Sequence, residues 1–123
     1  MISNNSVDVE KNVESIIHLI QEKKGEDIVV LDLRKITSVT DFFIITTGSS
    51  NVHVKAIAEE IQEKMKKEIK AIPWHVEGLE ARRWILLDYV DIVVHIFDAD
   101  SRLYYSIEKL WKDAKTLHVE TKY

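Results

Sequence analysis

Two apolar runs of strand length lie close together in the second half of the chain, and their spacing restricts the folds available. Residues Arg83–Asp88 and Ile92–Phe97 are separated only by Tyr89, Val90 and Asp91. Parallel neighbours in a sheet need a long crossover, whereas antiparallel neighbours can be joined by a short turn. The two runs therefore predict an antiparallel hairpin, and the sheet that contains them cannot be wholly parallel.

Regular elements are predicted on both sides of this hairpin. Apolar residues recur at spacings of three and four in two long segments, which is the period of one helical face. Two β-branched runs bounded by polar residues predict buried strands. In chain order, the predicted elements are a helix from Ser6, strands at 28–33 and 42–47, a helix from near Val52, a strand at 74–77, the two hairpin strands, and a helix that begins after Asp98 and Asp100.

The last of these predicted helices is followed by a tail. Leu103, Ile107, Leu110 and Trp111 fit the apolar face of the last helix, and Thr116–Tyr123 is expected to be a polar tail. The order αββαβββα predicts an α/β fold with a mixed five-stranded sheet, and 123 residues suit a single domain spanning 1–123. Helices of this length would cover one face of the sheet fully and the other in part. The uncovered part is expected to receive a partner.

Composition excludes several classes of function. The 17 basic and 21 acidic residues give a net charge of −4, which disfavours nucleic acid as the main partner, since such binding depends on neutralising phosphates. The absence of cysteine removes disulfides, thiolate zinc sites and cysteine nucleophiles. No run reaches the length of about 20 apolar residues that spans a bilayer, and the first ten residues do not resemble a secretory signal. These features predict a soluble, cytoplasmic protein.

One alternative is a metal-dependent nucleotidyl or phosphoryl transferase. Gly48 and Ser49 lie between a predicted strand and a predicted helix, where backbone N–H groups can hold an anion. Asp98 and Asp100 are the acids that would carry the metals. However, the segment lacks the glycines and the lysine of a phosphate-binding loop, and both aspartates suit helix capping. A strand-to-helix turn with a serine cap is the favoured interpretation.

The histidines and serines offer two further chemical readings. Ser49 or Ser50 with His53 could form a nucleophile and base, but the same residues suit the capping of a helix. His95 with the two aspartates that follow could bind a metal, but a histidine within an apolar strand is more often a hydrogen-bonded core residue. The structural interpretation is favoured for both groups.

The aromatic residues favour a binding module over an enzyme. Trp111 is expected to pack in the core. Trp84 opens a strand directly after a polar turn, so its large ring is expected at the margin of the sheet. Tryptophan and tyrosine in such positions are frequent interface anchors, because they bury a large area at a small entropic cost. Trp84 is therefore the leading candidate for contact with a partner.

A set of motifs in order along the chain resembles the ribosomal silencing factor (Iojap-like) family. The resemblance extends from about residue 6 to residue 114, with Asn51 departing from the residue types that the family often has there. The matching blocks are Asp41–Ser50, His53 and Val54, Val76–Gly78, Trp84–Asp88, Asp91, Val94–Phe97, Arg102, Tyr105 and Glu108–Trp111.

The resemblance implies a homodimer-forming α/β domain that is distantly similar to nucleotidyltransferases but lacks their catalytic acids. It implies binding to the large ribosomal subunit through ribosomal protein L-fourteen, on the surface that faces the small subunit. Occupying that surface would block subunit joining and lower translation when nutrients fail, and a role in maturation of the large subunit is also implied. No enzymatic activity, cofactor or metal is expected.

The matched blocks also indicate which residues would contact the partner. We expect apolar anchoring from Trp84 and Leu86, aromatic packing from Tyr105, and salt-sensitive pairing from the charged members. For Arg102, a bond to a carboxylate or a helix end within the molecule is an equally good interpretation. The complete expected set is Trp84, Glu77, Gly78, Leu86, Asp88, Arg102 and Tyr105.

Overall fold

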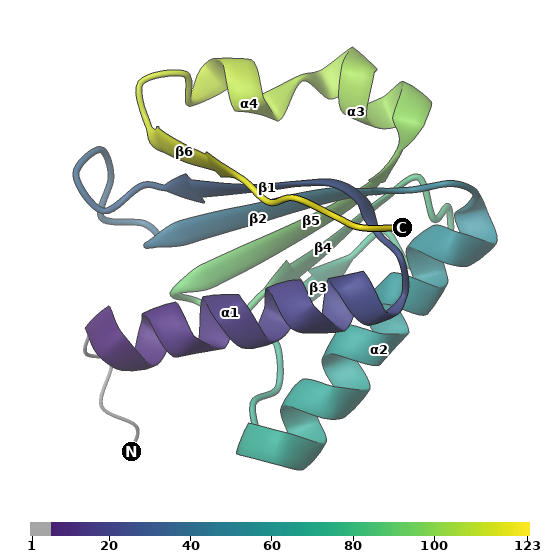
Figure 1. Ribbon diagram of the computed structural model, residues 1–123, viewed down its shortest axis with the longest axis horizontal. Helices are drawn as coiled ribbons and strands as arrows, with labels where there is room; N and C mark the ends of the chain where they lie inside the picture. Colours follow the sequence, from purple (N-terminus) through teal and green to yellow (C-terminus); the bar gives the residue numbers. More distant parts are fainter. Residues whose placement is uncertain (1–5) are drawn as a thin grey trace.

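The computed structural model describes residues 6–123, with side chains from residue 8 onward (Figure 1). The first five residues, which belong to the predicted polar start, lie outside the described part. The helices are α1 (Ser6–Glu22), α2 (Asn51–Ile69), α3 (Ala99–Tyr105) and α4 (Ile107–Leu110). The strands are β1 (Glu26–Asp32), β2 (Phe42–Gly48), β3 (His75–Glu77), β4 (Trp84–Asp88), β5 (Ile92–Asp98) and β6 (Lys115–His118). No helix in the described part of the chain has the length and apolar character needed to cross a bilayer.

The strands form one mixed sheet in the order β3-β4-β5-β2-β1-β6. The predicted hairpin is present, because β4 and β5 pair antiparallel with Trp84 opposite Phe97. Among the described strands, β2 and β5 alone pair in parallel, and α2 lies in the long connection between them. The predicted α/β class with a mixed sheet is confirmed.

The predicted number of strands was wrong. The sheet has six strands rather than five, and the additional strand β6 forms from the start of the segment expected to be a polar tail. Leu117 pairs with Val30 of β1, and Val119 continues the contact by donating its N–H to the carbonyl of Ile28. All four residues of β6 are exposed, so they show no alternation of apolar and polar side chains. What holds β6 is backbone pairing along an otherwise open edge of the sheet, which leaves no sequence pattern.

The last predicted helix is interrupted. Ser106 has a positive φ of 45° and separates α3 from α4, so apolar residues spaced for one continuous helix no longer share a face. Ile107 is buried as expected, but Leu103 and Leu110 are 78% and 76% exposed. Ser106 follows Tyr105 directly, so this break sets the direction in which the end of α3 presents its tyrosines.

The two faces of the sheet are covered unequally. In Figure 1, α1 and α2 lie on one side of the sheet, and α3 and α4 lie on the other. The side under α1 and α2 holds the larger apolar core, which includes the fully buried Ile85, Leu87 and Ile96. The opposite core is smaller and is formed mainly by β1, β2, Phe97 and Ile107. The short helices α3 and α4 therefore cover only part of their face, as the helix lengths predicted.

Candidate functional site

The uncovered part of the sheet lies on β3 and β4. Burial alternates along β4, with Ile85 and Leu87 fully buried and Trp84, Leu86 and Asp88 only partly buried. Successive side chains of a strand point to opposite faces, so the three partly buried residues share the face that carries α3 and α4. The register places Glu77 of β3 beside Leu86, and therefore on the same face.

Trp84 is half-buried and is held by three aromatic or heteroaromatic neighbours. Its ring stacks on Phe97 with centroids 4.8 Å apart, and it meets Tyr105 at the same separation with a tilt of 45°. Its indole Nε1–H donates a hydrogen bond of 3.1 Å to Nδ1 of His95. One part of the ring is thus packed against the fold and the remainder stays accessible, which is the geometry of an anchor that can bury further area.

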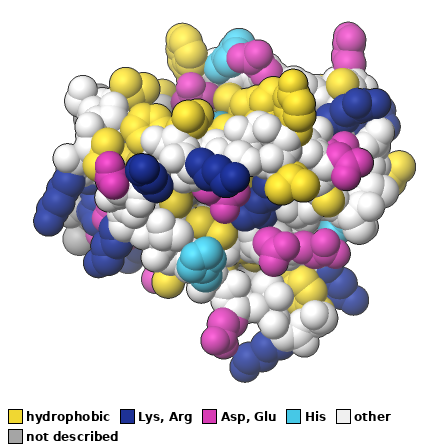
Figure 2. Space-filling model, turned by 90° about the horizontal axis from the view of Figure 1, so that it is seen from above, with side chains coloured by type: hydrophobic (Ala, Val, Ile, Leu, Met, Phe, Trp, Pro, Cys, Tyr) yellow, Lys and Arg dark blue, Asp and Glu magenta, His cyan; other side chains and the backbone are white. Residues whose placement is uncertain are grey.

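Tyr105 extends this surface from β4 onto α3. It is 50% exposed, and it meets Tyr104 edge to face with centroids 5.0 Å apart. A hollow of about 600 Å³ lies between the turn before β4 and α3, and both tyrosines line it together with Trp84, Arg83 and Asp100. Figure 2 views the side of the molecule that carries α3 and α4, where exposed hydrophobic side chains lie among acidic and basic ones.

Two acidic side chains complete the surface. Glu77 accepts a hydrogen bond of 2.8 Å from Nε2 of His75, which lies two residues earlier on β3. Oδ1 of Asp88 accepts a bond of 2.8 Å from the backbone N–H of Val90. We define the Trp84 surface as the contiguous set Glu77, Trp84, Leu86, Asp88 and Tyr105.

Gly78 supports this surface through its backbone. Its φ is +90°, a conformation that residues with a Cβ rarely adopt. A Cβ at this position would overlap the carbonyl oxygen of Trp84 and lie 2.9 Å from its carbonyl carbon. The glycine therefore allows the end of β3 to pass close to the start of β4, which positions both Glu77 and Trp84.

Arg102 is not part of the Trp84 surface. Its side chain is 13% exposed, and its Nε and Nη2 donate to the carboxylate of Glu108 at 3.0 and 3.1 Å. Its Nη1 donates to the carbonyl of Asp27 at 2.6 Å and to the hydroxyl of Thr47 at 2.9 Å. These bonds tie α3 to α4, to β1 and to β2. Of the two interpretations open for Arg102, the structure supports the intramolecular one.

His95 lies beneath the Trp84 surface and is 4% exposed. Because its Nδ1 accepts the hydrogen of the Trp84 indole, the neutral ring carries its own hydrogen on Nε2. That buried Nε2 has no hydrogen-bond partner among the described residues. An unsatisfied buried donor destabilises a fold by about 1–3 kcal/mol. The prediction of a hydrogen-bonded core histidine is confirmed, with one of its two nitrogens bonded.

Burial of His95 predicts acid sensitivity of the fold. Desolvation lowers the pKa of His95 from 6.5 to about 4, so between these values the unfolded chain binds a proton that the folded chain does not. Stability is therefore complete above pH 6.5 and falls as the pH drops toward 4, by about 3 kcal/mol from this residue. Denaturant unfolding at pH 7.5, 5 and 4 measures the effect. The variant His95→Phe should lack this component, and an equal loss in both proteins would contradict the assignment.

The residues of the alternative transferase site do not form a metal-binding group. The parallel register sets Gly48 opposite Asp98, so the two are neighbours in space as well as at strand ends. However, Oδ1 of Asp98 accepts a bond of 2.7 Å from the N–H of Ser101 and caps α3. Asp100 is exposed on the first turn of that helix. Across residues 8–123, no group of three or more acidic or histidine side chains is arranged to hold a metal.

Ser49, Ser50 and His53 act together as a cap. The Ser50 hydroxyl accepts from the N–H of His53 at 3.1 Å, which confirms the predicted serine cap of α2. Nδ1 of His53 accepts the N–H of Ser49 at 2.8 Å, and its Nε2 bonds the carbonyl of Lys23 at 2.6 Å. The imidazole thus joins the ends of two helices. The Ser49 hydroxyl also lies 3.1 Å from Nδ1, so the serine and histidine are adjacent, but both ring nitrogens are also engaged with the backbone.

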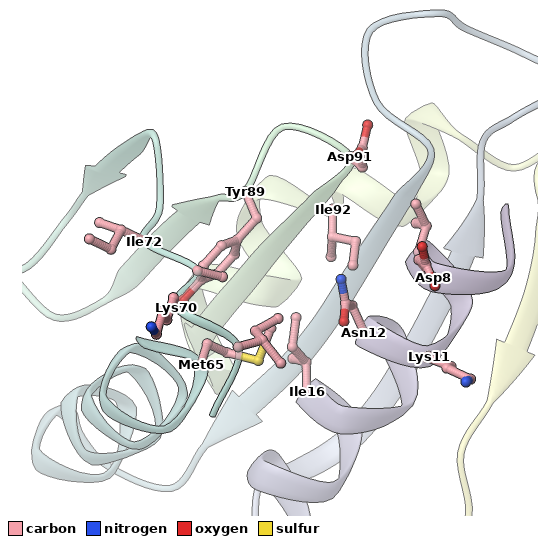
Figure 3. Close-up of a pocket in the computed structure, with 13 residues that line it drawn as sticks. Asp8, Lys11, Asn12, Ile16, Met65, Lys70, Ile72, Tyr89, Asp91 and Ile92 are labelled. Carbon is pink, nitrogen blue, oxygen red and sulfur yellow. The ribbon is translucent and has the colours of Figure 1, made fainter. Parts of the chain in front are cut away.

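A separate pocket of about 660 Å³ lies on the opposite face of the sheet (Figure 3). It is bounded by the first half of α1, the end of α2 and the β4–β5 hairpin, and Figure 3 shows Tyr89 extending from the hairpin toward Met65 and Lys70. Burial raises the pKa of Tyr89 to about 12, and burial together with Asp41 raises the pKa of Asp91. This pocket shares no residue with the Trp84 surface, and none of the predicted site residues lines it.

Comparison with known proteins identifies the family. The sequence model of the family described as "Ribosomal silencing factor during starvation" matches residues 6–122. The chain belongs to this family. The predicted resemblance is therefore confirmed. Ribosomal silencing factor RsfS of Halalkalibacterium halodurans is 41% identical over 107 residues, which cover 85% of this chain and 88% of that protein.

Structural and more distant relatives agree with the family assignment. A crystal structure of a Chromobacterium violaceum protein superposes with a TM-score of 0.80 at 37% identity, covering 90% of this chain and 92% of that one. A mouse protein named mitochondrial assembly of ribosomal large subunit protein 1 is 29% identical over 103 residues, which cover 81% of this chain and 45% of that one.

The residues of the Trp84 surface were all named from the sequence, but some residues that adjoin this surface were not. Trp84 was expected at the sheet margin because it follows a polar turn, and the matched motifs added Glu77, Leu86, Asp88 and Tyr105. The hollow also involves Arg83, Asp100 and Tyr104, which no motif singled out. The bond between Trp84 and His95 was missed as well, although both residues lie in the predicted hairpin. Its register pairs Trp84 with Phe97 and His95 with Leu86, which makes the two residues diagonal neighbours on one face.

Proposed function

We propose that this protein binds the large ribosomal subunit through the Trp84 surface and prevents it from joining the small subunit. The family is described by silencing of ribosomes during starvation, and the mouse relative is named for the large subunit. Following the family resemblance, the direct contact would be ribosomal protein L-fourteen on the face that meets the small subunit. Translation would fall under nutrient limitation, and a second role in large-subunit assembly is compatible with the same contact.

The observation that best supports this proposal is that α3 and α4 leave part of their face of the sheet uncovered. The equivalent side chains of β4 on the other face, Ile85 and Leu87, are fully buried under helices, whereas Trp84 and Leu86 remain partly accessible. A half-buried tryptophan flanked by a leucine and a half-exposed tyrosine is typical of a binding hot spot. A few such anchors supply most of the affinity of an interface.

The charge of the protein supports a basic partner. The net charge of −4, with Glu77 and Asp88 beside the aromatic residues, favours approach to a positively charged protein over bare RNA. Ribosomal proteins of the large subunit are generally basic. We therefore expect binding to weaken as salt increases, mainly through a slower association rate.

The proposed mechanism requires occupancy of a surface and no chemical step. A bound protein on the face that meets the small subunit would exclude that subunit sterically. We expect the protein to act in the cytoplasm, where a bacterial large subunit meets the small one, and we expect the free protein to form a homodimer. Equilibrium sedimentation of the purified protein measures that oligomeric state.

Purified subunits provide the direct test. Large and small subunits are mixed with and without saturating protein and separated on a sucrose gradient. We expect the protein to sediment with free large subunits and the peak of joined ribosomes to shrink. Undiminished joining at saturating protein would contradict the blocking mechanism, and absence of the protein from the large-subunit fraction would contradict binding itself.

A further inference from the structure

His95 is placed where an apolar residue would suit the fold better. It lies in the middle of β5, whose five other buried residues are all apolar, and it packs edge to face on Phe43 with centroids 4.5 Å apart. Its Nε2 is buried without a hydrogen-bond partner among the described residues. A phenylalanine would fill similar space without the unsatisfied Nε2, and the contact that it could not replace is the acceptor for the Trp84 indole. A polar residue at a buried position that suits an apolar one is often found where that residue serves function.

The one polar contact of His95 is with the proposed anchor. Burial lowers the pKa of His95 to about 4 and so keeps the ring neutral at neutral pH, and Nδ1 is the unprotonated nitrogen, because it accepts the Nε1–H of Trp84 at 3.1 Å. The stacking partners of Trp84 constrain the plane of the ring but not which edge faces inward. The hydrogen bond makes that choice, since only one edge of an indole carries a donor.

We propose that His95 is a positioning residue that holds the Trp84 indole in the orientation in which it meets the partner. This inference rests on the proposed function of the Trp84 surface. A ring that is already oriented loses less side-chain freedom on binding, so the contact is tighter than that of a free tryptophan. His95 itself is buried and does not touch the partner.

A double-mutant cycle tests the proposal. Binding to purified large subunits is measured for the wild type, His95→Phe, Trp84→Phe and the double variant, with the unfolding free energy of each. We expect His95→Phe to weaken binding about tenfold, the value of one hydrogen bond, while stability at pH 7 is equal or higher. In the Trp84→Phe background, which has no indole N–H, the same change should leave the affinity unaltered.

A matched variant and a second readout make the outcome decisive. His95→Asn carries an acceptor oxygen on Cγ, where the imidazole carries Nδ1, and should recover most of the affinity that His95→Phe loses. In NMR spectra, the indole N–H signal of Trp84, assigned by its absence in Trp84→Phe, should be protected from solvent exchange in the wild type and in His95→Asn but not in His95→Phe.

The possible failures are distinguishable. An equal loss of affinity in both Trp84 backgrounds, or an indole signal insensitive to His95→Phe, would overturn the positioning role. If the wild type does not bind large subunits at all, the proposed function fails, and the NMR comparison alone decides whether His95 orients the ring.

Discussion

Replacing Trp84 by alanine is expected to weaken binding to the large ribosomal subunit by about 30- to 1,000-fold, the range for loss of a central aromatic anchor. The ring lies at the centre of the Trp84 surface, with Leu86 beside it on the same face of β4 and Tyr105 4.8 Å away, centroid to centroid. Cosedimentation with purified subunits over a range of protein concentrations measures the change in affinity.

Trp74→Ala is the matched control for this prediction. Trp74 is 76% exposed and precedes β3, and it lies outside the Trp84 surface, so its loss removes a comparable ring without touching the proposed contact. Circular dichroism must show that Trp84→Ala remains folded, because the change also removes the stack on Phe97. Equal binding of Trp84→Ala and the wild type would exclude Trp84 as the anchor, and equal loss in both tryptophan variants would point to a different surface.

Gly78→Ala is expected to destabilise the fold by about 3 kcal/mol. A positive φ disfavours a residue with a Cβ by about 1–2 kcal/mol, and forcing extra atoms into a filled space adds about 1–3 kcal/mol. The obstructing atoms belong to the backbone of Trp84 and Ile85, so they cannot move aside by a change of rotamer. Urea unfolding at pH 7 measures the loss through the shift of the midpoint.

The exposed Glu80 in the same turn offers a control. Glu80→Ala should leave the midpoint within the range of ordinary surface substitutions, about 0.5 kcal/mol. We also expect Gly78→Ala to weaken large-subunit binding, because relief of the overlap must shift β3 away from Trp84. A midpoint identical to the wild type would mean that the turn relaxes freely and that Gly78 has no such positioning role.

Much of the fold could be predicted because local patterns encode it. The helical period of apolar residues specifies α1 and α2, and the short Tyr89–Asp91 connection specifies the antiparallel β4–β5 pair. The break at Ser106 was not predictable in the same way, because a non-glycine residue with positive φ carries no composition signal. Strand β6 escaped prediction because its exposed side chains show no alternation and only its backbone pairing with β1 defines it.

Some features of the candidate site could likewise be predicted from local patterns, and others could not. Alternation along β4 was enough to place Trp84, Leu86 and Asp88 on one face, since side chains of a strand point alternately up and down. The chain by itself therefore determined which face of β4 carries the anchor. Only the tertiary structure decided that α3 and α4 leave this face uncovered, that Tyr105 and His95 hold the ring, and that Arg102 points inward. Those facts depend on how elements distant in sequence pack together, and packing of that kind leaves no periodic trace along the chain.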